Sequence, residues 1–465
     1  MGSSSIVQPG AKAEFNSRSM GVKLIVVCGL AVSMTLPMLF VSGLVEERTR
    51  RAADVVREIS GYSGGQQTFL GPTLAIPYRI PAQSPGNYSR HGTYLVFPAQ
   101  ASAVLKTVTE ERRRSLFKVP VFQADVKLDS AFDLTGVPAA ALEGAELDWS
   151  RAEIVVGVSD ARGAVADAIL TAEGNDTVLV PAEIAPEITI GGDQNARTKL
   201  TLFGTRLESL AKPNARFNVA AALKFSGAQR VAVLSYGKTT HLTAQGDWAS
   251  PGFDGGFLPV KREISRRGFT AEWFVPFIAR GVHAEGQSDS FGGLQATALG
   301  TSFIEVADPY QSVSRSIKYV LLFLGLIFLS YFAFEAATGK RVHPAQYVLV
   351  GIAQVIFYLL LLSFAERIGF DWGFLMAGGA TVVLLSANVV WVFASRWHGM
   401  RALSTFSVLY LVIYLLLRME DNALLVGAIA SFLVVASAMY LTRRIDWYSS
   451  RALTATHGEI GRPQE

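Results

Sequence analysis

Six long apolar runs, each near the length of a membrane-crossing helix, constrain this chain of 465 residues most strongly. A helix crosses the roughly 30 Å hydrocarbon layer in about 20 residues, because its backbone polar groups must be bonded internally there. The first run is longer than the apolar core of a signal peptide, so it indicates a retained anchor, with cleavage near Ser42 and Gly43 as the alternative. The predicted spans are Leu24–Val45, Ile317–Ala337, Ala345–Ala365, Gly373–Ser395, Ala402–Leu417 and Ala423–Leu441.

The composition supports this prediction. Half of the residues are hydrophobic and only 17% are charged, whereas about 25% is usual in soluble proteins. A cytosolic enzyme, a disordered chain and a fibrous repeat are therefore excluded. We expect an integral membrane protein with one large extramembrane domain between the first and second spans.

The Lys and Arg residues beside the spans predict the orientation. With the N-terminus inside, the inner segments carry eleven Lys/Arg against four Asp/Glu, and the two short outer loops carry two against four. The large domain is nearly neutral, with 28 against 29, so the net charge of +4 comes from the membrane flanks and does not indicate nucleic-acid binding. The predicted parts are a cytoplasmic tail (1–23), the first membrane helix (24–45), the outer domain (46–316), a five-helix bundle (317–441) and a second cytoplasmic tail (442–465).

The outer domain shows a period of two. Apolar residues alternate with polar or small ones from Phe122 to Leu128, from Phe217 to Phe225 and from Phe269 to Val275, as in strands with one buried face. Before them, Glu46–Ser60 has helical spacing and continues the first span. The predicted fold class is an α-helical polytopic membrane protein of six transmembrane helices with a large, mainly antiparallel β domain between helices 1 and 2. That domain is either single or divided into two β lobes near residues 205–215.

Short matches to catalytic motifs do not meet their structural requirements. Gly61–Gly65 fits G-x-S-x-G around Ser63, but here a helix precedes the serine and a strand follows, the reverse of a nucleophile elbow. Gly237–Thr239 resembles the end of a phosphate loop, but position 232 is Ala, so a hairpin turn is the prediction. The six histidines have no metal-site spacing and Cys28 is the single cysteine. We predict no catalytic residue, no cofactor, no metal and no nucleotide or nucleic-acid partner.

Two features remain as binding candidates. In the loop 247–259, the aromatic residues Trp248, Phe253 and Phe257 alternate with Gly and Pro. Such a loop either binds a partner or packs as a satellite core. The run Arg112–Arg114 either meets anionic headgroups or is a solvated charge run.

Polar residues are rare within the predicted spans. Gln354 and Asn388 lie deepest, Glu366 is at an outer end, and Glu335 is expected to reach toward Lys340 or Arg341 at the inner end. Contacts between packed helices are the favoured interpretation, and a transport pathway is the alternative.

Several segments together resemble the CreD family of bacterial inner-membrane proteins. The resemblance extends from about Val45 to Leu441 and is carried by Glu58–Ser60, Gln67–Pro72, Ile76–Tyr78, Val155–Gly163, Gly268–Trp273, Asp308–Gln311, Arg315–Tyr319, Phe332–Glu335, Val342–Tyr347 and Leu349–Gly351. It implies an inner-membrane location and a role in envelope integrity with stress and antibiotic responses under two-component control. Combined with the predicted orientation, this location puts residues 46–316 in the periplasm. It implies no catalytic residues.

Three hypotheses follow. The first is a non-enzymatic envelope protein that contacts membrane lipids and an unidentified envelope protein or lipid through its β domain. The second is a transporter or lipid flippase that uses the C-terminal helices. The third is a hydrolase that uses Ser63.

Overall fold

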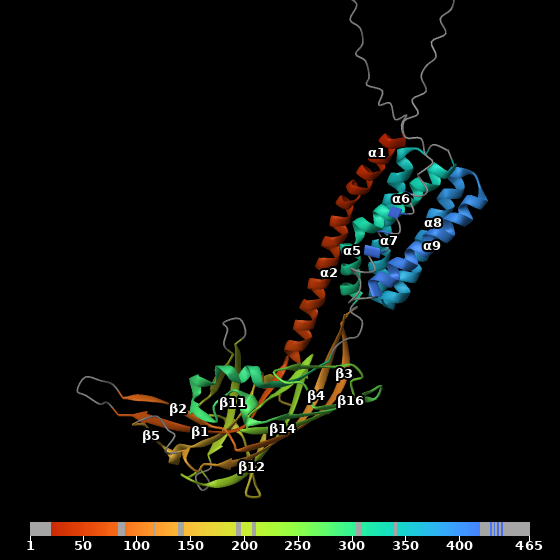
Figure 1. Ribbon diagram of the computed structural model, residues 1–465. Coiled ribbons are helices and arrows are strands. Elements are labelled where there is room, and N and C mark those ends of the chain that lie inside the picture. Colours follow the sequence, from red (N-terminus) through yellow and green to blue (C-terminus); the bar gives the residue numbers. More distant parts are fainter. Residues whose placement is uncertain are drawn as a thin grey trace, which may run out of the picture. The chain divides into compact units, whose positions relative to one another are not determined.

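The structure is a computed structural model that describes residues 20–81, 89–114, 117–137, 144–191, 197–206, 211–303, 309–338 and 342–418, with 428–429, 432, 435–436 and 439. Contacts divide the chain into a helical unit, Met1–Arg50 with Ala307–Glu465, and a β-rich unit, Arg51–Val306. Figure 1 shows the helices and strands of both units.

The β-rich unit contains two sheets. The larger sheet has the order β10-β11-β6-β1-β13-β19-β15, and β2, β5, β9 and β18 pair beside this path. Its strands are β1 (Gln67–Ile80), β2 (Arg90–Val96), β5 (Glu146–Leu147), β6 (Glu153–Val158), β9 (Val180–Pro181), β10 (Glu187–Ile190), β11 (Thr198–Arg206), β13 (Arg230–Leu234), β15 (Pro251–Gly255), β18 (Glu285–Gln287) and β19 (Ala298–Phe303).

The smaller sheet has the order β16-β17-β14-β3-β4-β12-β7-β8. Its strands are β3 (Gln100–Arg114), β4 (Phe117–Asp133), β7 (Ile169–Ala172), β8 (Asn175–Val178), β12 (Arg216–Ala228), β14 (Thr239–Gly246), β16 (Lys261–Ser265) and β17 (Gly268–Val275). The short helices of this unit are η1 (Trp149–Arg151), η2 (Ala161–Gly163), α4 (Phe277–Arg280) and η3 (Ser288–Thr297). Pairing is antiparallel except for β1 with β13 and β3 with β14 in the described residues.

The sheets share one hydrophobic core. Phe69 of the larger sheet meets Phe225 of the smaller edge-to-face at 5.4 Å, and Phe122 meets Phe303 at 5.1 Å. Burial alternates along β4 and β12, as the period of two predicts. The unit is therefore a sandwich whose core lies between two inner sheet faces.

Both sheets contain strands from before and after residues 205–215, so of the two alternatives left open by the sequence, the undivided β domain matches the strand order. One prediction about this unit is wrong. Gly237–Thr239 is not a hairpin turn, because β13 lies in the larger sheet and β14 in the smaller. The segment passes between sheets, and Gly237 lies so near Ala101 that a Cβ would meet the Ala101 backbone nitrogen at 2.9 Å. Local turn composition does not distinguish a hairpin from such a crossing.

The helical unit starts with one long helical segment. Helices α1 (Met20–Ser33) and α2 (Thr35–Tyr62) adjoin at Met34, three residues before Pro37, which has no backbone N–H for the helical ladder. As predicted, the helix continues beyond the first apolar run, since α2 ends only at Tyr62. The other helices are α5 (Pro309–Lys318), α6 (Val320–Thr338), α7 (Pro344–Ile368), α8 (Phe370–Phe393) and α9 (Arg396–Arg418).

Four helices in the described residues are long and apolar enough to cross a membrane: Lys23–Tyr62, Pro344–Ile368, Phe370–Phe393 and Arg396–Leu415. A fifth candidate is the pair Tyr310–Lys318 and Val320–Glu335, which is bent by 59°. The sixth predicted span, 423–441, falls almost entirely outside the described residues. His343 caps α7: its Nδ1 accepts from Ala345 N at 3.2 Å, and Pro344 follows at the first helical position.

Candidate functional site

The turn after α2 connects this helix to the β-rich unit. The backbone N–H of Gly65 donates to the carbonyl of Ser60 at 2.6 Å, and Gly64 and Gly65 have left-handed φ angles of 84° and 63°. Glycines with a left-handed φ commonly end helices in this way, so this turn is a glycine-based helix end. At the helix end itself, Val56 and Ile59 pack on Val119, Val121 and Ala228.

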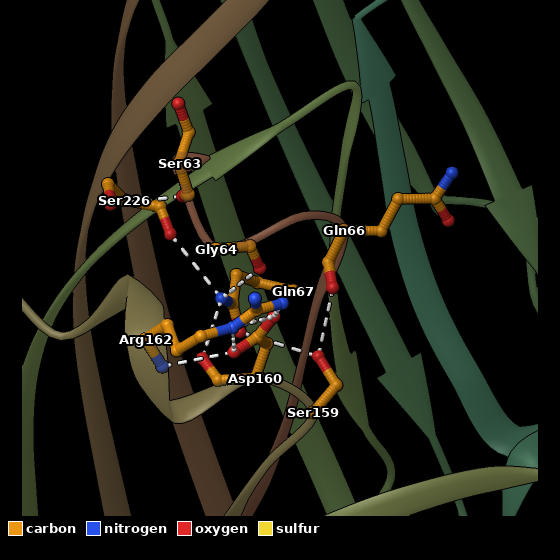
Figure 2. A network of polar contacts seen from close by, with 8 residues as sticks. All are labelled: Ser63, Gly64, Gln66, Gln67, Ser159, Asp160, Arg162 and Ser226. Carbon is orange, nitrogen blue, oxygen red and sulfur yellow. Dashed lines mark hydrogen bonds and ion pairs between the residues drawn. The ribbon is translucent and has the colours of Figure 1, made fainter. Parts of the chain in front are cut away.

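Behind the turn, Gln67 is fully buried and forms the centre of a polar network (Figure 2). Its Nε2 donates to Gly64 O at 2.7 Å, to Asp160 O at 3.0 Å and, more weakly, to Ser226 O at 3.4 Å. The neighbouring Gln66 side chain points away from the network. One amide thus joins the start of β1, the end of β6 and strand β12.

Two serines complete this network. Ser159 Oγ donates to Gln66 O at 2.9 Å and accepts from Thr68 N at 2.9 Å. Ser226 Oγ lies within hydrogen-bond distance of Ser63 O (3.0 Å) and Gly163 O (3.2 Å). We call Gly64, Gln67, Ser159, Asp160, Gly163 and Ser226 the Gln67 junction.

Space in the junction is very small. A Cβ on Gly64 would lie 2.5 Å from Gly163 Cα, and one on Gly163 would lie 2.5 Å from both Gln67 Nε2 and Ser226 O. Only glycine fits at these two positions. At the rim, the side-chain hydrogen bonds from Arg162 lower the pKa of Asp160 below its usual value.

The helical unit holds a second polar group. Glu335 is buried, and its carboxylate pairs with Lys23 and accepts from Tyr347 OH at 2.8 Å and from Val342 N at 3.0 Å. Lys23 also donates to Val342 O at 2.6 Å. We call these four residues the Glu335 cluster.

The side chain of Glu335 is 2% exposed and pairs with Lys23 of the first helix, a partner that the sequence did not indicate. Its expected contact with Lys340 or Arg341 stays a prediction. Lys340 and Arg341, the partners expected from the sequence, lie outside the described residues.

The other polar residues of the spans connect helices. Asn388 accepts from Tyr331 and donates to Gln346 at 3.1 Å. Glu366 accepts from Tyr310 at 3.1 Å. Gln354 is 2% exposed and accepts from Tyr410 at 2.9 Å, but its Nε2 has no partner in the described part of the chain.

The aromatic loop packs against the core of the β-rich unit. Trp248 meets Phe303 at 6.3 Å, Phe253 meets Trp273 at 5.6 Å, and the Phe257 carbonyl accepts from Trp273 Nε1 at 3.0 Å. These contacts are those of a satellite core, and partner binding by Trp248, Phe253 and Phe257 stays a prediction.

The short motifs around Ser63 and Arg112–Arg114 lie near the end of α2. Ser63 lies between α2 and β1, in the helix–turn–strand order that the sequence indicates. Arg114, at the end of β3, pairs with Glu58 of α2. In the described residues, no group of three or more His, Cys, Asp or Glu side chains could hold a metal ion.

Several network residues that sequence reasoning missed lie in segments that carry the family resemblance. Gln67 belongs to Gln67–Pro72, and Asp160 and Gly163 belong to Val155–Gly163. Glu335 and Tyr347 likewise belong to two resembling segments. Lys23, Gly64 and Ser226 lie outside these segments, so the resemblance could have drawn attention to one side of each network but not to the pairing.

Comparisons with known proteins agree on one family. The family model described as "Inner membrane protein CreD" matches residues 19–448. The inner membrane protein CreD of Escherichia coli (strain K12) is 30% identical over 430 residues, which cover 90% of this chain and 92% of that protein.

Proposed function

This chain belongs to the CreD family of inner membrane proteins, and from that premise we propose that it is a non-enzymatic protein that supports cell-envelope integrity and the response to envelope stress. In this proposal the chain has six spans with both termini in the cytoplasm, and residues 46–316 lie in the periplasm. The β-rich unit would contact an envelope protein or lipid.

The observation that carries this proposal is the Gln67 junction. It connects the end of the first membrane helix to the centre of the larger sheet through neutral, mutually bonded groups. Catalytic sites instead hold exposed nucleophiles and bases with shifted pKa values. A buried, bonded amide supports a role in holding the β-rich unit to its helix rather than in chemistry.

Two experiments test the proposal. Reporter fusions at residues 150 and 230 should give a periplasmic signal. Deletion of the gene should sensitise cells to detergents and cell-wall drugs, and Ser63→Ala should restore resistance as well as the wild type does. Cytosolic reporters, or normal growth of the deletion strain under every envelope stress, would overturn it.

Gln354 favours a second candidate, a transporter or lipid flippase. An unpartnered amide donor in a membrane bundle is costly and is often found at functional positions. In this case a triple replacement of Gln354, Asn388 and Glu366 should abolish function while the protein still inserts. An active triple variant would remove this candidate.

A further inference from the structure

The outer face of the smaller sheet carries a groove of about 670 Å³. It runs across the strands rather than along them. The paired positions Phe274, His241, Ser102, Asp129, Ala220 and Thr171 form one row over strands β17, β14, β3, β4, β12 and β7. We call this the Ser102 groove.

The floor of the groove lies close to the sheet backbone at its middle, because the side chains there are small. Ser102 and Ala220 flank Asp129 in the row, and Ala131 lies in the next row beside Asn218. Longer polar side chains rise around this floor. The sheet therefore presents a trough rather than a flat face.

Hydrogen-bonding groups in the groove are unused. In the described residues, the side chains of Ser102, Asp129 and Asn218 make no hydrogen bond or ion pair with the protein, although all three line the groove. Ser102 and Asp129 are held in place from below, because the hydroxyl of the buried Tyr236 lies within hydrogen-bond distance of both of their carbonyl oxygens, at 2.8 and 3.0 Å. A firm floor with free polar groups is typical of a preformed binding site.

Glu173 provides an independent observation. It lines the groove from the turn between β7 and β8 and has a left-handed φ of 50°, followed by Gly174 at 83°. Such two-residue turns favour Asn, Asp or Gly at this position. A glutamate here is conformationally costly, and strain of this kind is found most often at functional positions.

The lining chemistry excludes several ligand classes. Two carboxylates without any Lys or Arg among the described lining residues disfavour an anion such as a phosphate. Strands β3, β4 and β12 are each paired on both sides, so an extended peptide cannot add as a further strand. The free hydroxyl, amide and carboxylate groups among the lining residues would lose their hydrogen bonds to water beneath a purely apolar ligand.

We propose that the Ser102 groove binds a neutral oligosaccharide. Asp129, Asn218 and Glu173 offer the donors and acceptors that match paired sugar hydroxyls and N-acetyl groups. His241 lines one end of the groove, and the ring of Phe274 lies next to it, with the two ring centroids 4.6 Å apart. Phe274 is 47% exposed, so a sugar that extends past His241 can pack a face against this ring. This inference rests on the proposed function only for its location in the envelope.

The test uses the purified full-length protein in a detergent without sugar headgroups, titrated with chitotetraose by calorimetry. We expect a dissociation constant of about 0.1–1 mM, or about −5 kcal/mol. Ala220→Trp fills the trough and should weaken binding at least tenfold. Glu173→Asn suits the turn better, so it should weaken binding about threefold without lowering the melting temperature.

A matched control variant lies on the same sheet but away from the groove. Glu263→Asn removes an exposed carboxylate of edge strand β16 and should leave binding unchanged. The proposal is overturned if the wild type shows no binding up to about 10 mM, if Ala220→Trp binds normally, or if inositol hexakisphosphate displaces the sugar. Because the assay is independent of membrane sidedness, its failure is distinguishable from cytosolic reporters at residues 150 and 230.

Discussion

In the β-rich unit Gln67 joins three segments through neutral hydrogen bonds, whereas in the helical unit Glu335 and Lys23 join two helices through a buried ion pair. Both connect residues far apart in the chain: 93 positions for Gln67 and Asp160, and 312 for Lys23 and Glu335. The difference predicts how much stability each unit should lose when one of these side chains is removed. Loss of an amide leaves unsatisfied carbonyls, but loss of one ion leaves a charge without its partner.

The largest expected effect is that of Glu335→Ala. It strands the Lys23 ammonium, and we expect a loss of about 3–5 kcal/mol in the free energy of unfolding. Thermal unfolding in detergent would measure it. The double variant with Lys23→Met should recover much of the loss, and strictly additive effects would contradict a coupled pair. Arg50→Ala, which breaks the exposed pair with Glu46, is the matched control and should cost about 0.5 kcal/mol or less.

Gln67→Ala should have the next largest effect. It leaves the carbonyls of Gly64 and Asp160 without their donor, and we expect a loss of about 2–3 kcal/mol. Hydrogen exchange at residues 64–68 and 159–163 would locate the loss. Gln66→Ala, in the adjacent exposed position, should change little. If the two substitutions lowered the free energy of unfolding equally, the stabilising role of the Gln67 side chain in the junction would be contradicted.

Alanine substitutions at two glycines distinguish the cost of backbone strain from the cost of steric crowding. Gly64 and Gly136 have nearly the same φ, 84° and 87°, but of the two only Gly64 has described atoms within 4 Å of the point where a Cβ would lie. Gly136→Ala should cost about 1 kcal/mol from strain alone, and Gly64→Ala about 2 kcal/mol. Chemical denaturation of the two variants would check this, and a larger cost at Gly136 would contradict the crowding argument.

The smallest expected effect is a pH dependence at the surface of the β-rich unit. Hydrogen bonds from Thr135, together with those from Arg216, lower the pKa of Asp133 from 3.8 to about 2. Because the folded pKa is the lower one, the stabilisation is complete above about pH 4 and is lost as pH falls toward 2. Asp133→Asn should weaken the dependence of the free energy of unfolding on pH between about 2 and 4. Gln67→Ala should lower this free energy by the same amount at every pH. An unchanged slope in Asp133→Asn would contradict the assignment.

The sequence predicted those elements that are set by local periodicity. The alternation in Phe122–Leu128 identified a strand with one buried face, and the helical spacing of Glu46–Ser60 identified the extension of α2. The comparisons confirm a multi-pass membrane protein of the CreD family. The number of spans and the side of the membrane stay predictions.

The sequence could not predict which distant groups meet. Gln67 stands in a short polar stretch, and nothing near it indicates acceptors at Asp160 and Ser226. Lys23 precedes an apolar run and ends the predicted N-terminal tail, yet its partner follows some 300 residues later. Turn residues at Gly237 were equally compatible with a hairpin and with a sheet crossing. In each of these cases, the contact joins residues far apart in the sequence, and such a contact leaves no periodic pattern in the residues around either partner.

Strand β1 has a consequence for how the polypeptide acquires this structure. Its first residues pair with β6 on one side and with β13 on the other, so the first described strand to emerge during synthesis becomes an inner strand of the sheet. Gln67 lies opposite Val231, which is made much later. Until then this nearly all-buried segment lacks its neighbour. Such late closure is typical of slow folding, so a nascent chain arrested before β13 should expose β1 to proteases and chaperones.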